Sequence, residues 1–294
     1  MVRILRTQSI QSRSSAPVSI HRFAPGGADF QNAIMDQVAV EEPLEIRLNF
    51  ERDGASFEQT ISITMRTPDA DIDLALGFLF SEGVIQKYDE VVSASHCGPG
   101  VPDKNLVNVV KVVLQPGCSP DPQRLLRNIV TSSGCGVCGK TSIDALELQS
   151  QFQSEADPFR INTEQLLSLP QTLRDRQSAF LDTGGLHGAG LFDNSGSLHQ
   201  VMEDVGRHNA LDKLVGCSLR RDHLPWREQG VLLSGRISFE LVQKVAMAGG
   251  SLIAAIGAPS SLAIEAAAKF DITLVGFLKA TGFNIYGDAS RFDA

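Results

Sequence analysis

Apolar and polar residues alternate along two neighbouring stretches in the first quarter of the chain, Leu44–Phe50 and Phe57–Thr67. A period of two is typical of strands that bury one face. Asp53-Gly54 lies between the two stretches, and an Asp-Gly pair favours the tight turn of a β-hairpin. The pattern therefore predicts two antiparallel strands joined at Asp53-Gly54.

A helix and a further strand are expected next. Leu74–Phe80 is apolar and of helical length, and Gly83 is placed to end the helix. Asp69 or Asp71 is placed to cap its start. Val107–Leu114 reads as a strand. These elements predict a small α+β domain over residues 31–121, after a flexible tail over residues 1–30 that shows no periodicity.

Strands and helices alternate over the last third of the chain. Short apolar runs suited to buried strands are separated by segments of helical length; the runs are Val231–Leu233, Ser251–Ile256 and Ile272–Phe277, and the helical segments are Phe239–Ala248 and Ser260–Phe270. Strand–helix–strand repeats predict neighbouring parallel strands with right-handed crossovers. We therefore predict an α/β domain over residues 122–294 with a mixed, partly parallel sheet.

The carboxyl ends of these predicted strands carry small, hydroxyl and basic residues, in the segments Ser234-Gly235-Arg236, 257–261 and 279–282. Ligands of open α/β sheets bind beyond the carboxyl ends of the strands, and helix N-termini there bind phosphate. A phosphate-binding pocket is therefore expected, in which Arg236 could hold a phosphate through two hydrogen bonds. A surface pair between Arg236 and Glu240 is the alternative.

Two cysteines, Cys135 and Cys138, lie in a glycine-rich and basic segment, Gly134–Lys140. The CxxC spacing often lowers the pKa of a thiol. An expected helix at Pro122–Val130 precedes the segment, and a capping-box sequence at Thr141–Asp144 follows it, so the helix dipole would favour a thiolate. The pattern fits half of a zinc site, a disulfide redox pair, or a cysteine that carries a transferable sulfur.

The zinc alternative has the least support. A closed structural zinc site needs four ligands, and the residues that could complete one have no diagnostic spacing: Cys97, Cys118, His187 and His208. Zinc-dependent deaminases carry H-x-E and P-C-x-x-C, whereas Gly188-Ala189 follows His187 here and Gly134 precedes Cys135.

Two further polar segments carry candidate chemistry. Residues 183–190 are rich in glycine and contain His187, which could move a proton or could be incidental to a tight turn. Residues 203–209, with the sequence Glu-Asp-Val-Gly-Arg-His-Asn, precede an apolar helical run. Asp204 could cap that helix, and Asp212 is placed one turn after His208 to orient its imidazole.

Composition narrows the function classes. The net charge of −8 over 294 residues argues against nonspecific binding to nucleic acid. Five cysteines are an odd and sparse set for a secreted disulfide framework, and no apolar stretch of signal-peptide length lies at the N-terminus. Residues 245–258 are apolar but interrupted by glycines, which predicts a core segment and no membrane span. A reducing cytoplasm is the expected compartment.

Taken together, these segments resemble the FdhD family of formate dehydrogenase accessory sulfurtransferases. The resemblance runs over nearly the whole chain after the tail and rests on segments that follow one another in order: Glu42-Pro43-Leu44, 74–78, 81–83, 134–139, Thr183-Gly184-Gly185 with His187, 203–209, Leu211-Asp212-Lys213, 234–240, 274–277 and Tyr286.

The resemblance implies a cytoplasmic homodimer whose larger domain is a cytidine-deaminase-like, three-layer α/β domain. It also implies that Cys135 takes a persulfide sulfur from a cysteine desulfurase, with Cys138 assisting. The sulfur would pass to the bis(molybdopterin guanine dinucleotide) molybdenum cofactor that the catalytic subunit of formate dehydrogenase needs. A noncatalytic cofactor chaperone for the apo-dehydrogenase is the alternative, as is a zinc-dependent deaminase.

The segment after the last core strand would contact this cofactor by resemblance: Phe277, Leu278, Lys279, Ala280, Thr281 and Gly282. Ser234, Arg236 and His187 are the further cofactor-binding candidates. Gly282 stands where family members often carry a basic residue, while Lys279 keeps one positive charge. We expect no tightly held metal of the protein's own.

Overall fold

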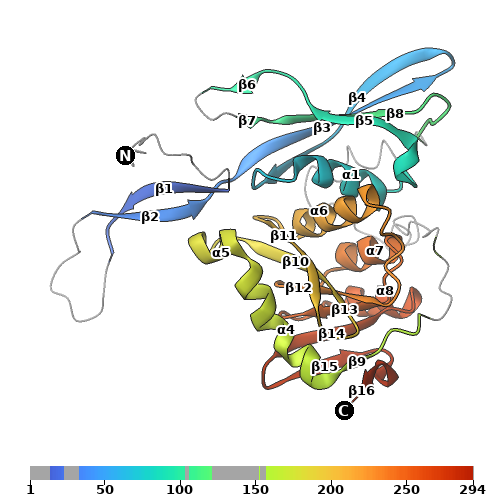
Figure 1. Ribbon diagram of the computed structural model, residues 1–294. Helices are drawn as coiled ribbons and strands as arrows, with labels where there is room; N and C mark the ends of the chain where they lie inside the picture. The colour runs from blue at the N-terminus through green and yellow to red at the C-terminus, as the bar shows by residue number, and fades with distance from the viewer. Residues whose placement is uncertain (1–13, 23–32, 103–105, 121–151, 153–156, 294) are drawn as a thin grey trace.

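The computed structural model describes residues 14–22, 33–102, 106–120, 152 and 157–293, and it contains two main sheets separated by helices (Figure 1). The N-terminal sheet has the strand order β4-β3-β8-β5, and the C-terminal sheet has the order β11-β10-β12-β13-β14-β15. The predicted mixed α/β class is therefore confirmed. The cytidine-deaminase-like type of the larger domain stays a prediction.

The N-terminal sheet begins with the expected hairpin. Its strands are β3 (Glu42–Arg52), β4 (Ala55–Arg66), β5 (Val91–His96) and β8 (Val109–Leu114). The turn lies at Asp53 and Gly54, whose φ angles are 52° and 76°. Helix α1 (Asp71–Ser81) covers the face on which every second residue of β3 is buried. Shorter elements complete this part: η1 (Tyr88–Glu90), β6 (Gly100–Val101) and β7 (Leu106–Val107).

The predicted cap of α1 is wrong. Ala70 is the N-cap residue, with a φ of 52° and no side-chain cap. Asp71 is instead held by the buried guanidinium of Arg66, through two hydrogen bonds of 2.8 Å each. The predicted end is confirmed, because the helix stops at Ser81 and Gly83 follows with a φ of 67°.

The C-terminal sheet has three parallel strands at its centre, as predicted. Its strands are β10 (His187–Asp193), β11 (Leu198–Asp204), β12 (Gln229–Leu233), β13 (Leu252–Ala255), β14 (Thr273–Lys279) and β15 (Gly282–Tyr286). Strands β12, β13 and β14 run parallel, and the other pairs are antiparallel. The crossovers contain α7 (Phe239–Met247) and α8 (Ser261–Lys269).

Alternate residues of this sheet face two different helix layers. Leu233 and Ala255 belong to the core shared with α7, α8 and α6 (Arg207–Arg220). Leu232 and Ala254, one position earlier, belong to a second core on the opposite face with α4 (Thr163–Arg176). The central strands are therefore apolar on both faces, as in parallel sheets covered on both sides. Strands β9 (Ile161–Asn162) and β16 (Phe292–Asp293) and helix η2 (Ala289–Arg291) border this second core.

Helix α4 is longer than the sequence pattern predicts. The polar stretch 151–175 predicts a surface connection with a short helix, yet α4 has 14 residues. Leu166, Leu169 and Leu173 are fully buried and form a stripe with the spacing of one helix face. These three leucines, with the partly buried Leu167, pack the mainly polar helix onto the sheet.

The predicted tail is also wrong for part of its length. Strand β1 (Ser15–Ile20) pairs with β2 (Ile34–Ala39) in an antiparallel ribbon that extends sideways beside the short helix α5 (Ser178–Thr183) (Figure 1). Ser, Ala and Pro in β1 hide the strand pattern, and the pairing partner lies beyond residue 30.

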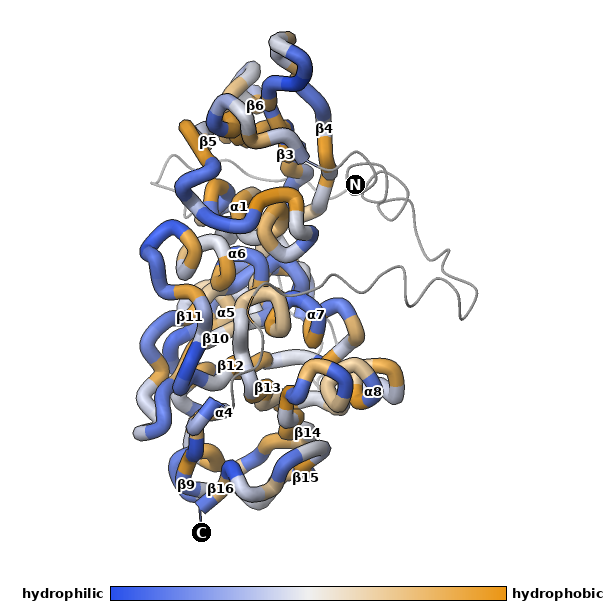
Figure 2. Tube along the Cα trace, turned by 90° about the vertical axis from the view of Figure 1, so that its right-hand side faces the viewer, coloured by the Kyte–Doolittle hydropathy of each residue, from blue (hydrophilic) through white to orange (hydrophobic). Residues whose placement is uncertain are grey.

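The two main sheets are built from residues on either side of the predicted boundary at 121–122. Helices α1 and α6 pack directly against each other between the sheets, and the turned view shows the same stacking (Figure 2). One continuous apolar core runs from β3 through both helices to β12.

Candidate functional site

A cavity of about 650 Å³ lies at the edge of the C-terminal sheet where the parallel strands end. Five residues predicted for cofactor binding line it together: His187, Ser234, Leu278, Lys279 and Ala280. They come from the start of β10, the residue after β12, and the end of β14 together with the residue that follows it. The location matches the expectation that ligands bind beyond the carboxyl ends of parallel strands.

Backbone pairing fixes the floor of this cavity. The Gly188 N–H donates to Ser234 Oγ at 2.8 Å, and the Ser234 N–H donates to the Gly188 carbonyl at 2.9 Å. Ser234 Oγ also lies 3.5 Å from Nδ1 of His187. The hydroxyl of Ser234 is therefore held at the cavity by main-chain bonds that extend the β10–β12 ladder.

His187 is half-buried at the cavity. Burial lowers its pKa below the ordinary value, and the nearby Arg207 lowers this pKa further. Both effects favour the neutral imidazole over the charged form. Because Nδ1 faces the Ser234 hydroxyl, Nε2 is the ring nitrogen left to meet a ligand, without added charge.

Six lining residues come from α4, α5 and the residue between them and were not expected from the sequence: Leu167, Pro170, Gln171, Arg174, Gln177 and Phe180. They lie within a polar stretch that gives no recognisable motif. Only the fold of α4 back onto the sheet brings this stretch to the strand ends.

The charge of the cavity is opposite to that of the whole chain. Its charged lining residues are Arg174 and Lys279, and the lining contains no carboxylate. The chain as a whole carries a net charge of −8. A local cationic cavity in an acidic protein favours an anionic small ligand.

The other predicted cofactor contacts lie outside the lining. Arg236 is exposed, and Phe277 is 45% exposed with a φ of 55°. Thr281 lies in the turn between β14 and β15, and Gly282 begins β15. Glu240, the alternative partner weighed for Arg236, lies 3.9 Å from His208.

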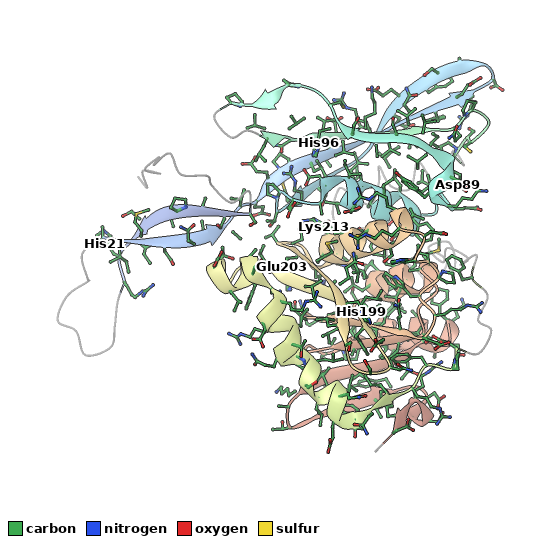
Figure 3. The ribbon with its side chains drawn as sticks, viewed as in Figure 1. His21, Asp89, His96, His199, Glu203 and Lys213 are labelled. Atoms are coloured by element: carbon green, nitrogen blue, oxygen red, sulfur yellow. The ribbon has the colours of Figure 1, made fainter. Side chains whose placement is uncertain are left out.

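The segment 203–209 is mainly structural. Asp204 is fully buried and lies 2.7 Å from Nζ of Lys213, whose ammonium also donates to the carbonyls of Thr67 and Glu203. Figure 3 shows Lys213 on α6 and Glu203 close to α5. The Glu203 carboxylate accepts hydrogen bonds from the Ala179 and Phe180 N–H groups and so fixes the start of α5.

Two predictions for this segment are wrong. The N-cap of α6 is Gly206, because the oxygens of Asp204 are taken up by other partners, including Lys213. Asp212 does not orient His208: its carboxylate pairs with the buried Lys244 at 2.8 Å, and His208 lies 3.2 Å from the hydroxyl of Ser238.

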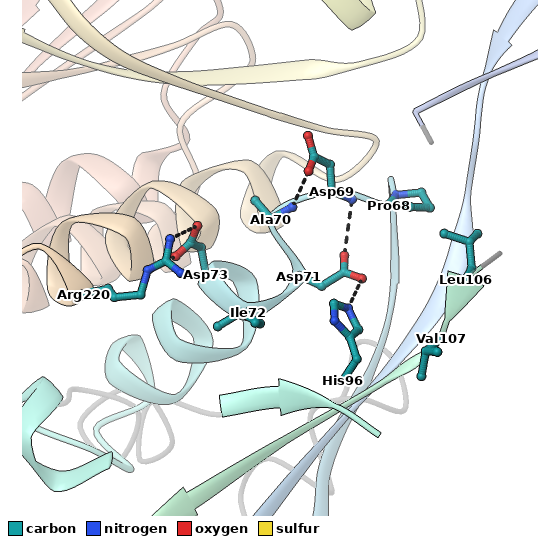
Figure 4. Close-up of a pocket in the computed structure, with 10 residues that line it drawn as sticks. All are labelled: Pro68, Asp69, Ala70, Asp71, Ile72, Asp73, His96, Leu106, Val107 and Arg220. Atoms are coloured by element: carbon teal, nitrogen blue, oxygen red, sulfur yellow. Dashed lines mark hydrogen bonds and ion pairs between the residues drawn. The ribbon is translucent and has the colours of Figure 1, made fainter. Parts of the chain in front are cut away.

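A second cavity, of about 430 Å³, lies at the start of α1 (Figure 4). Asp69, Asp71 and Asp73 all line it. Asp71 is bound to Arg66 and to His96, and Asp73 is paired with Arg220. Three carboxylates against the single guanidinium of Arg220 leave this lining more acidic than that of the first cavity, which disfavours an anionic ligand.

The cysteine pair Cys135 and Cys138 lies outside the described residues, as do the helix predicted at 122–130 and the capping box predicted at 141–144. The described cysteines are free thiols: Cys97, Cys118 and Cys217. Within the described ranges, no cluster of three or more His, Cys, Asp or Glu side chains is placed to hold a metal ion. None of the helices in that part of the chain has both the length and the apolar character to span a membrane.

The chain is similar to known proteins over most of its length. Residues 39–293 match the FdhD/NarQ family. The sulfur carrier protein FdhD of Streptomyces avermitilis is 46% identical over 258 residues, which are 87% of this chain and 89% of that protein. The sulfur carrier protein FdhD of Nocardia farcinica is 43% identical over 283 residues, which are 96% of each chain.

A solved structure shows the same fold. The crystal structure of a formate dehydrogenase accessory protein from Desulfotalea psychrophila superimposes with a TM-score of 0.69 at 24% identity, covering 95% of this chain and 100% of that one.

Proposed function

Because the chain belongs to the FdhD/NarQ family, we propose that it is a cytoplasmic sulfurtransferase. In this proposal Cys135 accepts a persulfide sulfur from a cysteine desulfurase. The sulfur then passes to the bis(molybdopterin guanine dinucleotide) molybdenum cofactor, as substrate, before that cofactor serves the catalytic subunit of formate dehydrogenase. The protein acts as a homodimer without nucleic-acid or membrane partners.

The loading step is a thiol exchange. The Cys135 thiolate attacks the outer sulfur of the desulfurase persulfide, a new S–S bond forms on Cys135, and the desulfurase cysteine leaves as a thiolate. No net oxidation occurs, and the product is a reversible cysteine cap. Release of the sulfur as hydrosulfide needs two electrons. Cys138 can supply them by attacking Sγ of Cys135, which leaves a Cys135–Cys138 disulfide.

The cationic cavity supports the part of the proposal in which the protein binds the molybdenum cofactor. A guanine dinucleotide is a large anion with planar bases, and this cavity has two cations, no lining carboxylate and an aromatic ring. Lys279 would hold phosphate oxygens, Arg174 would add a second positive charge to the cavity wall, and Ser234 would donate a hydrogen bond. The cavity volume of about 650 Å³ suits one nucleotide half of such a cofactor.

Complementation in cells tests this function. A host that lacks its own copy of the protein but contains a desulfurase and formate dehydrogenase should recover formate dehydrogenase activity with the wild-type chain. Cys135→Ala should abolish this recovery, whereas Cys97→Ala, a matched change at a half-buried cysteine, should preserve it. A noncatalytic chaperone predicts the opposite for Cys135→Ala, namely full recovery.

Metal analysis separates the zinc-dependent deaminase from the sulfurtransferase. The purified sulfurtransferase should contain no stoichiometric zinc. One zinc per chain that is lost in a Cys135→Ala, Cys138→Ala double variant would favour the deaminase.

A further inference from the structure

Gln177 carries an unused hydrogen-bond donor at the cationic cavity. The residue lines the cavity and is only 3% exposed. Its Nε2 atom is buried and has no hydrogen-bond acceptor in the described part of the chain. Buried side-chain donors are nearly always paired, so this amide calls for a specific explanation.

The backbone and packing hold Gln177 in place. It is the single residue between α4 and α5, and its N–H donates to the Arg174 carbonyl at 3.2 Å. Its carboxamide lies directly over Gly188, where an added Cβ would come within 2.6 Å of Gln177 Cδ. The amide is therefore held against the cavity floor, where it does not meet bulk water.

A flat cationic and aromatic pair lies on the same wall. The Arg174 guanidinium lies 5.8 Å from the centroid of the Phe180 ring, and both residues line the cavity. The Glu203 carboxylate accepts the Phe180 N–H at 2.8 Å and so fixes the position of this residue. Planar groups of this kind stack on nucleobases.

We propose that Gln177 is the residue that selects the base of the bound nucleotide, with its Nε2 donating to O6 of guanine while the base stacks on the Arg174–Phe180 pair. The inference rests on the proposed function for the presence of a guanine nucleotide. Adenine carries an amino group where guanine carries O6, so with the carboxamide in the orientation observed here two donors would face each other and adenine would bind less tightly. A polar group left unpaired by the wrong ligand is a strong source of selectivity.

Gln177→Met tests this assignment with GDP and ADP as the probes in isothermal calorimetry. The wild-type chain should bind GDP at least about tenfold more tightly than ADP. Gln177→Met should lose this preference, with GDP affinity falling about tenfold and ADP affinity changing less than about twofold. Without nucleotide, its unfolding midpoint should equal or exceed that of the wild type, because a buried unpaired donor has been replaced by an apolar group of similar size.

Gln200→Met is the matched control. Gln200 Nε2 is also buried without a partner in the described residues, but Gln200 does not line the cavity. This variant should keep the preference for GDP. Gln177→Glu provides a second test if Gln177→Met fails to fold. A carboxylate accepts hydrogen bonds, so this variant should shift the nucleotide preference from GDP toward ADP.

The outcomes separate the inference from the proposed function. A folded Gln177→Met or Gln177→Glu protein that keeps the wild-type preference for GDP overturns the role of Gln177 and leaves the sulfurtransferase proposal standing. A wild-type chain that binds neither GDP nor ADP overturns both the role of Gln177 and the proposed cofactor site.

Discussion

Gly77 of α1 and Gly216 of α6 lie against each other where the two helices cross. A Cβ on Gly77 would collide with the carbonyl oxygen of Asp212 and come within 2.8 Å of the Gly216 nitrogen. A Cβ on Gly216 would collide with the carbonyl oxygen of Asp73. The backbones of the two helices are therefore in direct contact, and this contact joins the two main sheets through one core.

Gly77→Ala and Gly216→Ala should each destabilise the protein by about 3 kcal/mol, since a rigid backbone and not a flexible side chain must move. The double variant should lose less unfolding free energy than the two single variants together, because the first added methyl group already separates the helices. Urea unfolding measures all three. Gly100→Ala is the control, because a Cβ added at Gly100 would lie an ordinary 3.7 Å from its nearest neighbour. Equal losses of unfolding free energy for Gly77→Ala and Gly100→Ala would contradict the close helix contact.

The buried pair of Lys213 and Asp204 should be far more important than a surface pair. Both side chains are at most 2% exposed and their charged atoms are 2.7 Å apart. Lys213→Ala leaves the Asp204 carboxylate buried without its cation and should cost about 3–5 kcal/mol. Arg160→Ala removes an ion pair in which both partners are 60% exposed, and it should cost less than about 1 kcal/mol. Similar unfolding free energies for the two variants would argue against a structural role for residues 203–213.

Acid should weaken the fold through Asp71. Burial alone would raise the pKa of Asp71, but the hydrogen bonds and charge of Arg66, assisted by His96, outweigh burial and bring this pKa below the ordinary value. The stabilisation by Asp71 is therefore complete above the unfolded-state pKa of about 4, and it is lost as the pH falls through the lower folded-state value.

Asp71→Asn should consequently be less stable at pH 7, and its unfolding free energy should fall less steeply than that of the wild type below pH 4. Urea unfolding between pH 3 and pH 7 provides the comparison, with Asp89→Asn at an exposed position as the control. Parallel pH profiles for Asp71→Asn and the wild type would disprove this linkage.

The two cations of the cavity should govern nucleotide affinity. Lys279→Ala and Arg174→Ala should each weaken GDP binding by about tenfold at low salt, since the first removes a charge-assisted contact to phosphate and the second removes the cation on which the base stacks. The difference from the wild type should shrink at high ionic strength, where salt screens these exposed charges. Lys87→Ala, at an exposed position outside the cavity lining, should bind GDP as the wild type does. If all three variants bind alike, the cavity is not the phosphate site.

Local patterns predicted much of the fold. The hairpin at Asp53-Gly54 and the three parallel strands follow from periodicity and turn residues alone, because each element is determined by its own residues. Strand β1 was missed because it forms only by pairing with β2, which lies beyond residue 30. The length of helix α4 was underestimated because its leucines are held by packing against the sheet.

In the candidate site, too, the residues that local patterns mark could be predicted, and those that only tertiary packing brings together could not. Ser234 and Lys279 could be found because strand ends bear ligand-binding residues in α/β folds, and His187 because it lies in a glycine-rich segment. Arg174 and Gln177 could not, since only the packing of α4 and α5 brings them to that edge. The helix cap expected of Asp204 and the His208–Asp212 pair were wrong because Lys213 and Lys244 take the two carboxylates.

Sulfur loading of Cys135 can be observed directly by intact-mass spectrometry after incubation with a cysteine desulfurase and cysteine. The wild-type chain and Cys138→Ala should each gain the mass of one sulfur atom, which a thiol reductant removes, and Cys135→Ala should gain none. A Cys135→Ala chain that acquires the sulfur as completely as the wild type would contradict the proposed sulfurtransferase mechanism.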